Sequence, residues 1–412
     1  MKRLLITGAS GYIGTRLVEL AIGKGYEVIA LGSPPPGSRI RTVPWRLGEA
    51  PAPELLAGAK AVIHLGHAWS SDAQHGSGPD NINLSGSERL AGAVLEAGIP
   101  RFVYASTTSS RAGALNAYGR VKHAIEARLQ ALPGAAEGIS CARVGLVYGG
   151  PGQGLFGLLS KLVSLTPVLP MIGLDRQVQP IHLDEVCAGL LRLAEEPPLH
   201  RPVVILAGPE PVTFGSWLRL LRRALAGKRL ILVPVPIPLA LLACDLTRLI
   251  PFFPTVDRER VLGLAGAAPM DSRADLALLS IEVADPLAKL AEAPVARRRR
   301  IGEAVAMLRY VSGGSACSIG PVIRLARVIA RTPGTRPALP ALVLRWPGLL
   351  RLLEPWRPSM NHQLARELHL AAMVVESEPM ARMPAAPARV LKELAQDALA
   401  LPFRILFGRI YA

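Results

Sequence analysis

The length, composition and charge of this chain exclude several classes of protein before any motif is considered. Its 412 residues suffice for two or three domains. Half of the residues are hydrophobic, but the most apolar stretch, at 230–242, is broken by prolines, so no membrane-spanning helix is expected. The net charge of +16 reflects abundant arginine, whereas aromatic residues make up only 5% and do not alternate with the basic ones, so nucleic-acid binding is not expected.

Short apolar strands and amphipathic helices alternate along the first 150 residues. The pattern predicts strands at 3–7, 26–31, 61–65, 101–106 and 139–144, and helices at 11–22, 83–97 and 115–132. The basic start is followed by a glycine-rich turn, so we interpret it as a first strand and not as a signal peptide. This alternation predicts an α/β fold, a Rossmann-type doubly wound parallel sheet with helices on both faces.

The pattern loosens after residue 150, where we expect a smaller substrate lobe. Helices are predicted at 155–165, at 183–193 with Asp184 as N-cap, and at 214–225 with Thr213 as N-cap, together with a strand at 203–206. The basic segment at 294–300 marks a boundary. We therefore expect a nucleotide-binding domain at 1–150, its sheet completed by 180–207, an interleaved substrate lobe at 151–293 and an all-helical C-terminal appendage at 294–412.

A glycine-rich turn joins the first strand to the first helix, in the sequence TGASGYIG at 7–14. Gly8 permits the tight turn, Gly11 lets the backbone approach a pyrophosphate, and Gly14 lets the helix pack closely on the sheet. The free N–H groups at the helix start attract phosphate. We expect this loop to bind a dinucleotide through residues that also include Ser10, Tyr12 and Ile13.

The end of the second strand bears on which dinucleotide is bound. An enzyme that uses NAD places an acidic residue there for the ribose, but this chain has Gly32 and Ser33. Without a carboxylate to repel it, a 2′-phosphate could be held by Ser33, Arg39 and Arg41. The sequence therefore favours NADP, with NAD as the alternative.

Seven motifs in order give the chain a family resemblance over residues 1–190. They are TGASGYIG, VIHLGH at 62–67, NINLSGSERL at 81–90, FVYAST at 102–107, AYGRVK at 117–122, ARVGLVYGG at 142–150 and PIHLDEV at 180–186. Together they resemble the extended or atypical branch of the short-chain dehydrogenase/reductase superfamily, the NAD-dependent epimerase/dehydratases. The resemblance implies Tyr118 as general base, Lys122 as its partner and Thr107 as a substrate-holding hydroxyl. It also implies cofactor contacts from Tyr118, Lys122, Leu65, Gly66, Asn83 and Val144.

The implied pair of Tyr118 and Lys122 makes chemical sense on its own. The two residues stand at i and i+4, so one helix presents both on the same face. We expect the ammonium to lower the pKa of the phenol, so that it accepts the proton of an alcohol while hydride leaves for the cofactor. The expected activity is that of an NAD(P)-dependent oxidoreductase or epimerase acting on a secondary alcohol or ketone of a small molecule, either nucleotide-sugar-like or lipid-like.

Some features depart from that branch and leave alternatives open. Thr108 and Ser109 stand where related 4,6-dehydratases carry an acidic pair, so sugar dehydration is not expected. The link between Thr107 and Tyr118 is short, and the run at 230–290 is similar to atypical members related to an NAD(P)H-binding accessory subunit of respiratory complex I. In that group the resemblance implies a structural cofactor, so one alternative is a non-catalytic NADPH-binding scaffold.

The C-terminal region suggests a further alternative, a peripheral membrane or assembly protein. On the helix predicted at 319–331, Arg324, Arg327 and Arg331 share a face opposite apolar residues that include Ile319, and 403–411 repeats the pattern. Such a helix can lie on an anionic membrane or pack on its own protein.

The remaining sequence features carry expectations about location, metals and assembly. The four widely spaced cysteines predict free thiols, no metal site and a cytoplasmic location, with membrane association through the C-terminal helices left open. A homodimer is also left open. We interpret His182, Trp346 and Trp356 as structural residues.

Overall fold

The computed structural model describes residues 2–69, 81–150, 153–195, 201–247, 258–291, 294–314, 319–331, 339–354 and 363–376. The chain divides into two compact units. Unit 1 comprises residues 1–161, 168–218 and 232–286, and unit 2 comprises residues 162–167, 219–231 and 287–412. Trp356, the segment 403–411 and one of the four cysteines, Cys317, lie outside the described residues.

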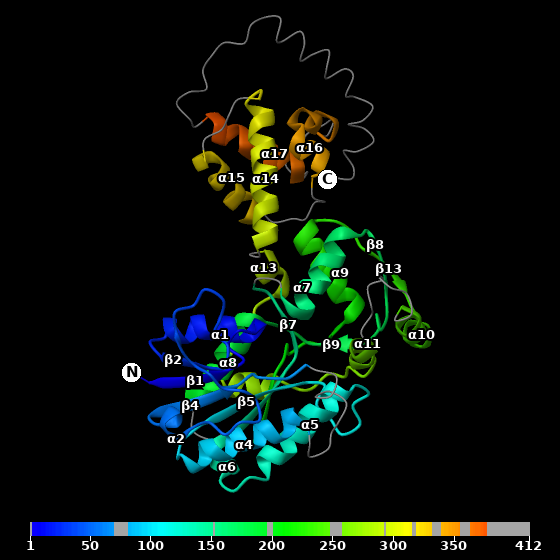
Figure 1. Cartoon of the computed structure of the whole chain (residues 1–412). Coiled ribbons are helices and arrows are strands. Elements are labelled where there is room, and N and C mark those ends of the chain that lie inside the picture. The colour runs from blue at the N-terminus through cyan, green and yellow to red at the C-terminus, as the bar shows by residue number, and fades with distance from the viewer. Residues whose placement is uncertain are drawn as a thin grey trace, which may run out of the picture. The chain divides into compact units, whose positions relative to one another are not determined.

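A seven-stranded parallel sheet forms the centre of unit 1 (Figure 1). Its order is β11-β6-β5-β4-β1-β2-β3, from β1 (Arg3–Thr7), β2 (Glu27–Leu31), β3 (Arg41–Val43), β4 (Ala59–His64), β5 (Phe102–Thr107), β6 (Ile139–Val144) and β11 (Val203–Leu206). The strand order reverses between β1 and β4, which is where a doubly wound sheet binds its ligand. The predicted α/β Rossmann fold is confirmed.

Helices cover both faces of this sheet because each strand alternates its apolar side chains between the two faces. On β1, Leu4 and Ile6 pack toward α1 (Tyr12–Gly23) and α8 (Leu183–Glu195). Leu5 packs in the cluster that includes residues of α4 (Ile82–Glu96) and α5 (Ala117–Gln130). The other helices around the sheet are α2 (Pro53–Leu56), α6 (Ala135–Gly138) and α12 (Arg273–Leu278). Figure 1 shows α1 and α8 on one face and α4 and α5 on the other.

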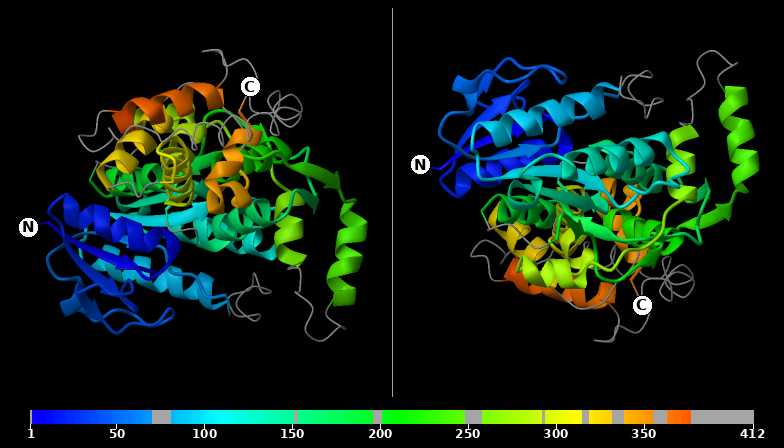
Figure 2. Two further views of the ribbon diagram at one scale, coloured as in Figure 1. Left: turned by 90° about the horizontal axis from the view of Figure 1, so that it is seen from above. Right: turned by 90° about the horizontal axis from the view of Figure 1, so that it is seen from below.

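The segments after residue 145 form three small two-stranded sheets, and further helices lie between and after these strands in the sequence. The strands are β7 (Leu146–Tyr148) with β10 (Pro180–His182), β9 (Gln177–Val178) with β12 (Val212–Thr213), and β8 (Val168–Met171) with β13 (Ile231–Pro234). The helices are α7 (Gly154–Leu165), α9 (Phe214–Ala226), α10 (Ile237–Thr247), α11 (Arg258–Ala265) and α13 (Pro286–Ala291). Both views of Figure 2 place α10 at the margin of unit 1, away from β2 and β3.

Unit 2 contains the helical C-terminal region, as predicted. Its helices are α14 (Pro294–Val311), α15 (Ile319–Arg331), α16 (Ala341–Arg345), the 3₁₀ helix η1 (Pro347–Leu352) and α17 (Gln363–Glu376). Met307, Leu325 and Leu364 are fully buried in their shared apolar core. Ile319 departs from the prediction, because it is 79% exposed and lies at the start of α15, outside this core.

Local details of the prediction are both confirmed and corrected. Thr213 caps α9, since its Oγ1 accepts a hydrogen bond from the Ser216 N–H at 3.2 Å. Asp184 is not the N-cap of α8, because the helix already begins at Leu183 and the Asp184 carboxylate instead binds the Arg16 guanidinium at 2.6 Å. The short, half-buried strand β3 is absent from the strands that the apolar pattern predicted. Among the described residues, no helix is long and apolar enough to cross a membrane.

Candidate functional site

The glycine-rich turn lies at the point where the strand order reverses. Gly8 has φ of +66°, and a Cβ there would stand 2.9 Å from the Gly66 backbone nitrogen, so the turns after β1 and β4 are in direct contact. A Cβ on Gly14 would stand 2.2 Å from the Gly8 carbonyl oxygen, which explains why only glycine lets α1 start so close to the turn. Both positions therefore need glycine for the fold itself.

Gly11 differs from its two neighbours in the motif. It is exposed, it has an extended backbone with φ of −74°, and a Cβ there would meet only the Gly8 oxygen, at 3.2 Å. As N-cap of α1 it offers no side-chain acceptor to the first N–H groups of the helix. The space above Gly11 and exposed Ser10 is thus open to an anion, and the loop fits a pyrophosphate.

A chain of buried hydrogen bonds fixes the turn after β4 against this loop. Thr7 Oγ1 accepts from the Gly66 N–H at 3.1 Å and lies 2.6 Å from His64 Nδ1. His64 Nε2 lies 3.0 Å from Ser87 Oγ, which donates to the Asn83 carbonyl at 2.6 Å. Burial lowers the pKa of His64 to about 3, so the ring is neutral and carries one N–H. Because the Ser87 hydroxyl donates to the Asn83 carbonyl, we assign the N–H to Nε2, which donates to Ser87, and Nδ1 accepts from the Thr7 hydroxyl.

The remaining predicted cofactor contacts lie at the same edge of the sheet. The Asn83 side chain brackets Ala68, accepting from its N–H at 2.7 Å and donating to its carbonyl at 3.1 Å, so it orders the loop that begins at Leu65. Val144 ends β6, and its carbonyl accepts from the Thr108 N–H. The Tyr12 hydroxyl donates to the Gly149 carbonyl at 2.7 Å, and Ile13 packs on the core beside it.

The arginines expected to hold a 2′-phosphate are not equally placed. Ser33 follows the end of β2 closely and is exposed. Arg39 precedes β3 and Arg41 is its first residue, so both lie away from the edge of the sheet at which the strands end. Arg46 follows β3, is exposed, and belongs to a loop that touches the Ser33 region, because a Cβ on Gly32 would stand 3.3 Å from the Trp45 carbonyl oxygen. Sequence reasoning did not place Arg46 beside Ser33, although the direction of the parallel strands could have done so.

Tyr118 and Lys122 lie one turn apart in α5, beside the end of β5. The Lys122 ammonium is buried, donates to the Ala105 carbonyl at 2.8 Å, and stands 5.8 Å from the centre of the Tyr118 ring. It also lies 4.5 Å from the centre of the Tyr104 ring. Thr107 ends β5, and its Oγ1 accepts from the Ser109 N–H at 3.2 Å. The structure thus brings the predicted tyrosine and lysine together next to this strand end.

The electrostatics of this pair differ from the sequence expectation. Burial raises the pKa of Tyr118 to about 12 and lowers the pKa of Lys122 to about 7. In the cofactor-free protein Tyr118 is therefore a protonated phenol at neutral pH, suited to donate a proton. Lys122 titrates close to neutrality and can exchange protons there.

Two residues of the loop after β4 pack on Tyr118, and sequence reasoning missed both contacts. Trp69 stacks on its ring, with centres 5.3 Å apart and planes 15° apart, and His67 meets it edge-on at 5.1 Å. Trp69 is 66% exposed. His67 Nε2 is buried without a hydrogen-bond partner among the described residues, and burial lowers the pKa of this side chain to about 3. A neutral polar atom and an indole thus stand beside the phenol.

Two carboxylates anchor α5, one within the helix and one at its start. Glu126, one turn beyond Lys122, is buried and binds the Arg143 guanidinium at 2.7 Å and the Ser106 hydroxyl at 2.5 Å. Glu259 of α11 accepts hydrogen bonds from the backbone N–H groups of Ala117 at 2.6 Å and Tyr118 at 3.4 Å. No sequence motif indicated either role, because each depends on partners far along the chain.

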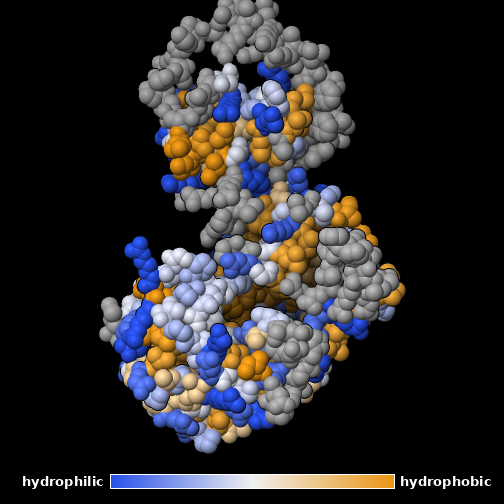
Figure 3. Space-filling view, in the orientation of Figure 1, coloured by the Kyte–Doolittle hydropathy of each residue, from blue (hydrophilic) through white to orange (hydrophobic). Residues whose placement is uncertain are grey.

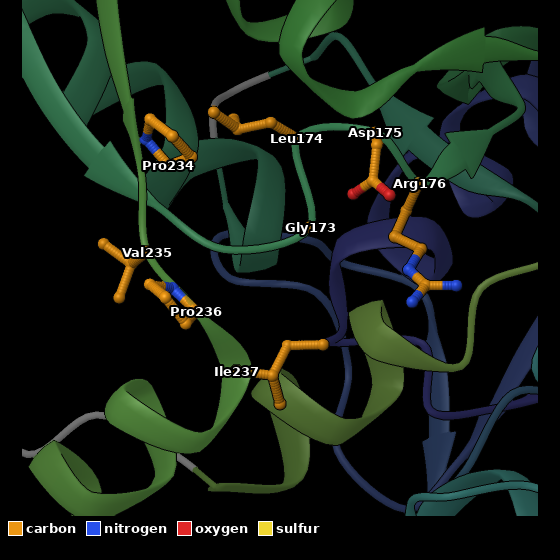
Figure 4. A pocket seen from close by; sticks show the side chains of 8 residues that line it. All are labelled: Gly173, Leu174, Asp175, Arg176, Pro234, Val235, Pro236 and Ile237. Carbon is orange, nitrogen blue, oxygen red and sulfur yellow. The ribbon is translucent and has the colours of Figure 1, made fainter.

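A second feature of unit 1 is a cavity of about 460 Å³ beside β13 (Figure 4). Pro234, Val235 and Pro236 form one wall, and Asp175 and Arg176 lie opposite. The lining is completed by Gly173, Leu174 and Ile237. Its surface is mostly apolar, with one carboxylate and one guanidinium at its side.

Comparison with known proteins agrees with this geometry. Residues 4–204 match the model of the NAD dependent epimerase/dehydratase family. Over these residues the chain is similar to that family. Ceramide reductase of Caulobacter vibrioides is 29% identical over 201 residues, which cover 47% of this chain and 61% of that protein. The chain thus matches about three fifths of the length of this curated relative.

Solved structures share the fold at low identity. MoeE5 in complex with UDP-glucose and NAD superposes with a TM-score of 0.54 at 21% identity, covering 72% of this chain and 99% of that one. The human epimerase family protein SDR39U1 with NADPH gives a TM-score of 0.54 at 21% identity, covering 70% and 98%. Unit 1 therefore shares the Rossmann fold of these solved structures.

Proposed function

We propose that unit 1 is an NADP(H)-dependent reductase that converts a ketone of an apolar molecule to a secondary alcohol. The observation that carries this proposal is the Tyr118–Lys122 pair beside the end of β5, with a phenol that is protonated at neutral pH. A protonated phenol favours reduction, because the carbonyl oxygen must gain a proton when hydride reaches its carbon.

The residues at the switch point fit a nicotinamide dinucleotide. The open space at Gly11 and the start of α1 would hold the pyrophosphate, and exposed Ser33 and Arg46 would hold a 2′-phosphate. When bound, the reduced cofactor supplies a hydride to the substrate carbon. The cofactor preference rests on the missing acid after β2 and on Arg46, which supports NADP over NAD.

The chain's own residues then account for the proton. Tyr118 donates its hydroxyl proton to the ketone oxygen, and Thr107 holds that oxygen through its own hydroxyl. Lys122 lies next to the phenol, and its pKa of about 7 allows it to pass a proton from solvent back to the phenolate. One hydride and one proton thus convert the ketone to the alcohol, and the tyrosine returns to its starting state.

The apolar surfaces of unit 1 and the residues after Thr107 support an apolar substrate over a sugar. Thr108 and Ser109 supply no carboxylate for elimination, and the cavity beside β13 has mostly apolar walls. Val233, Leu239 and Leu242 are exposed nearby in β13 and α10, and Figure 3 shows apolar surface over this part of the molecule. The similarity to ceramide reductase, a protein named for acting on a lipid, points in the same direction.

A panel of ketones tests the substrate class. The purified full chain should oxidise NADPH with long-chain aliphatic keto compounds presented in detergent micelles, and should leave it unchanged with nucleotide-diphosphate keto sugars. Turnover of the keto sugars alone would overturn the apolar assignment while preserving the reductase. Oxidation of NADPH by none of the ketones, in a protein that binds it, would overturn the enzyme proposal.

One observation favours a second candidate function, a non-catalytic NADPH-binding scaffold. Trp69 stacks on the Tyr118 ring and occupies one of its faces. If this contact closes the site, Trp69→Ala should create activity that the native chain lacks. If the indole is part of the substrate pocket, the same variant should instead raise KM for an apolar ketone while leaving the NADPH affinity unchanged.

A further inference from the structure

The first turn of α5 has a capping arrangement that its own sequence does not supply. The residue before the helix, Asn116, makes no side-chain hydrogen bond to the helix start. The first N–H groups of any helix lack partners inside the helix, and a frayed first turn moves every side chain on it. Tyr118 is the second residue of α5, so its phenol depends directly on how this turn is held.

The missing acceptor comes from a segment 142 positions further along the chain. Glu259 Oε2 accepts from the Ala117 N–H at 2.6 Å and from the Tyr118 N–H at 3.4 Å. A carboxylate at this position satisfies two otherwise unpaired donors and complements the positive end of the helix dipole. The cap is therefore supplied by α11 and not by the loop that leads into α5.

The helix that carries Glu259 is itself held close to α5 and its preceding loop. A Cβ on Gly263 would stand 3.1 Å from Asn116 Nδ2, so glycine permits the close approach. The Arg111 guanidinium donates to the Gly266 carbonyl just beyond α11. On its other side, Val261 is 4% exposed and packs with Leu264 against Ile172 and Val235 near the cavity of Figure 4.

We propose that Glu259 is a positioning residue for Tyr118, and that α11 holds the reactive tyrosine in register from outside the nucleotide-binding region. Glu259 does not touch the reacting atoms in this account. It holds the backbone from which the phenol projects, and its catalytic consequence rests on the proposed reductase function. The hydrogen-bond cap itself does not depend on that function.

Hydrogen–deuterium exchange of the full chain tests the cap without any assay of activity. In Glu259→Ala the amides at Ala117 and Tyr118 should exchange roughly fivefold faster or more, the factor that corresponds to losing a typical helix cap. Glu259→Gln keeps an acceptor oxygen and should restore most of the protection. Glu96→Ala, which removes an exposed carboxylate at the end of α4, is the matched control and should leave this peptide unchanged. Unaltered exchange in Glu259→Ala would overturn the proposal.

Kinetics then separate positioning from general stability. With a ketone substrate, Glu259→Ala should lower kcat about tenfold at unchanged NADPH affinity, and Glu259→Gln should recover most of the rate. Equal loss in NADPH affinity and kcat, with lower thermal stability and no rescue by glutamine, would show a merely structural role and overturn the positioning proposal. If the native chain shows no turnover while the exchange result holds, the reductase proposal fails and the cap stands.

Discussion

Gly11→Asp separates cofactor binding from folding more cleanly than any other change in the glycine loop. Gly8 and Gly14 cannot accept a side chain without backbone overlap, but Gly11 has φ of −74° and ψ of 175°, and its Cβ would meet only the Gly8 oxygen at 3.2 Å. Gly11 is also the N-cap of α1, a position where aspartate is preferred over glycine by about 0.3 kcal/mol. The folded protein should therefore keep its stability to within about 1 kcal/mol, because the gain from the cap offsets the tight contact with the Gly8 oxygen.

The same substitution should abolish dinucleotide binding. A carboxylate about 4 Å from a phosphate charge costs up to about 4 kcal/mol at an effective dielectric constant of about 20. A net penalty of about 3 kcal/mol weakens binding by more than ~100-fold.

Thermal unfolding of the cofactor-free protein and fluorescence titration with NADPH measure the two effects separately. Gly23→Asp, at the exposed far end of α1, adds the same charge and should bind NADPH normally. A folded Gly11→Asp protein with native affinity would refute the assignment of this loop as the pyrophosphate site.

Four further predictions follow from the site and the C-terminal region. Arg46→Ala should weaken NADPH binding at least ~10-fold, with little effect on NADH, in parallel titrations; equal losses for both cofactors would remove Arg46 from the 2′-phosphate site. Tyr118→Phe should bind NADPH normally and lose at least ~100-fold in kcat. Burial lowers the pKa of Lys122 from 10.5 to about 7, so between these pH values the unfolded protein binds more protons than the folded one, and the free energy of unfolding should rise with pH. Lys122→Met should flatten this rise and stabilise the cofactor-free protein at pH 7. An unchanged slope in this variant would contradict the burial of the ammonium. If the exposed Arg324 and Arg327 on α15 bind an anionic membrane, sedimentation of the protein with anionic vesicles should fall as the salt concentration increases. It should be lost when these two residues and Arg331 are changed to Gln. A protein that does not sediment with the vesicles at low salt would exclude this surface as a membrane-binding site.

The sequence predicted the Rossmann sheet well because its signals are local. Each predicted strand of the first 150 residues lies within about two residues of an observed one, since buried parallel strands appear as short apolar runs between turn residues. The glycine loop was identifiable for the same reason, as three glycines with distinct steric roles stand in one short segment. The spacing of Tyr118 and Lys122 likewise needs only the period of a helix.

The features that sequence reasoning missed depend on interactions between distant segments. Glu126 meets its partner Arg143 on the neighbouring strand, and Glu259 lies 142 positions after Ala117, whose N–H it accepts. The expected lowering of the Tyr118 pKa considered the lysine charge but not burial, which raises the pKa in the cofactor-free site. The three-residue strand β3 has neither the length nor the apolar pattern to be recognised locally.

Isotope transfer tests the central proposal, hydride delivery to a ketone at Tyr118, most directly. The full chain is incubated with an apolar ketone and NADPH that carries deuterium at the reactive nicotinamide carbon, and the product is examined by mass spectrometry. The proposal predicts one deuterium on the carbinol carbon of the alcohol, formed by the native chain and not by Tyr118→Phe. An alcohol without deuterium, or equal labelling by Tyr118→Phe, would contradict it.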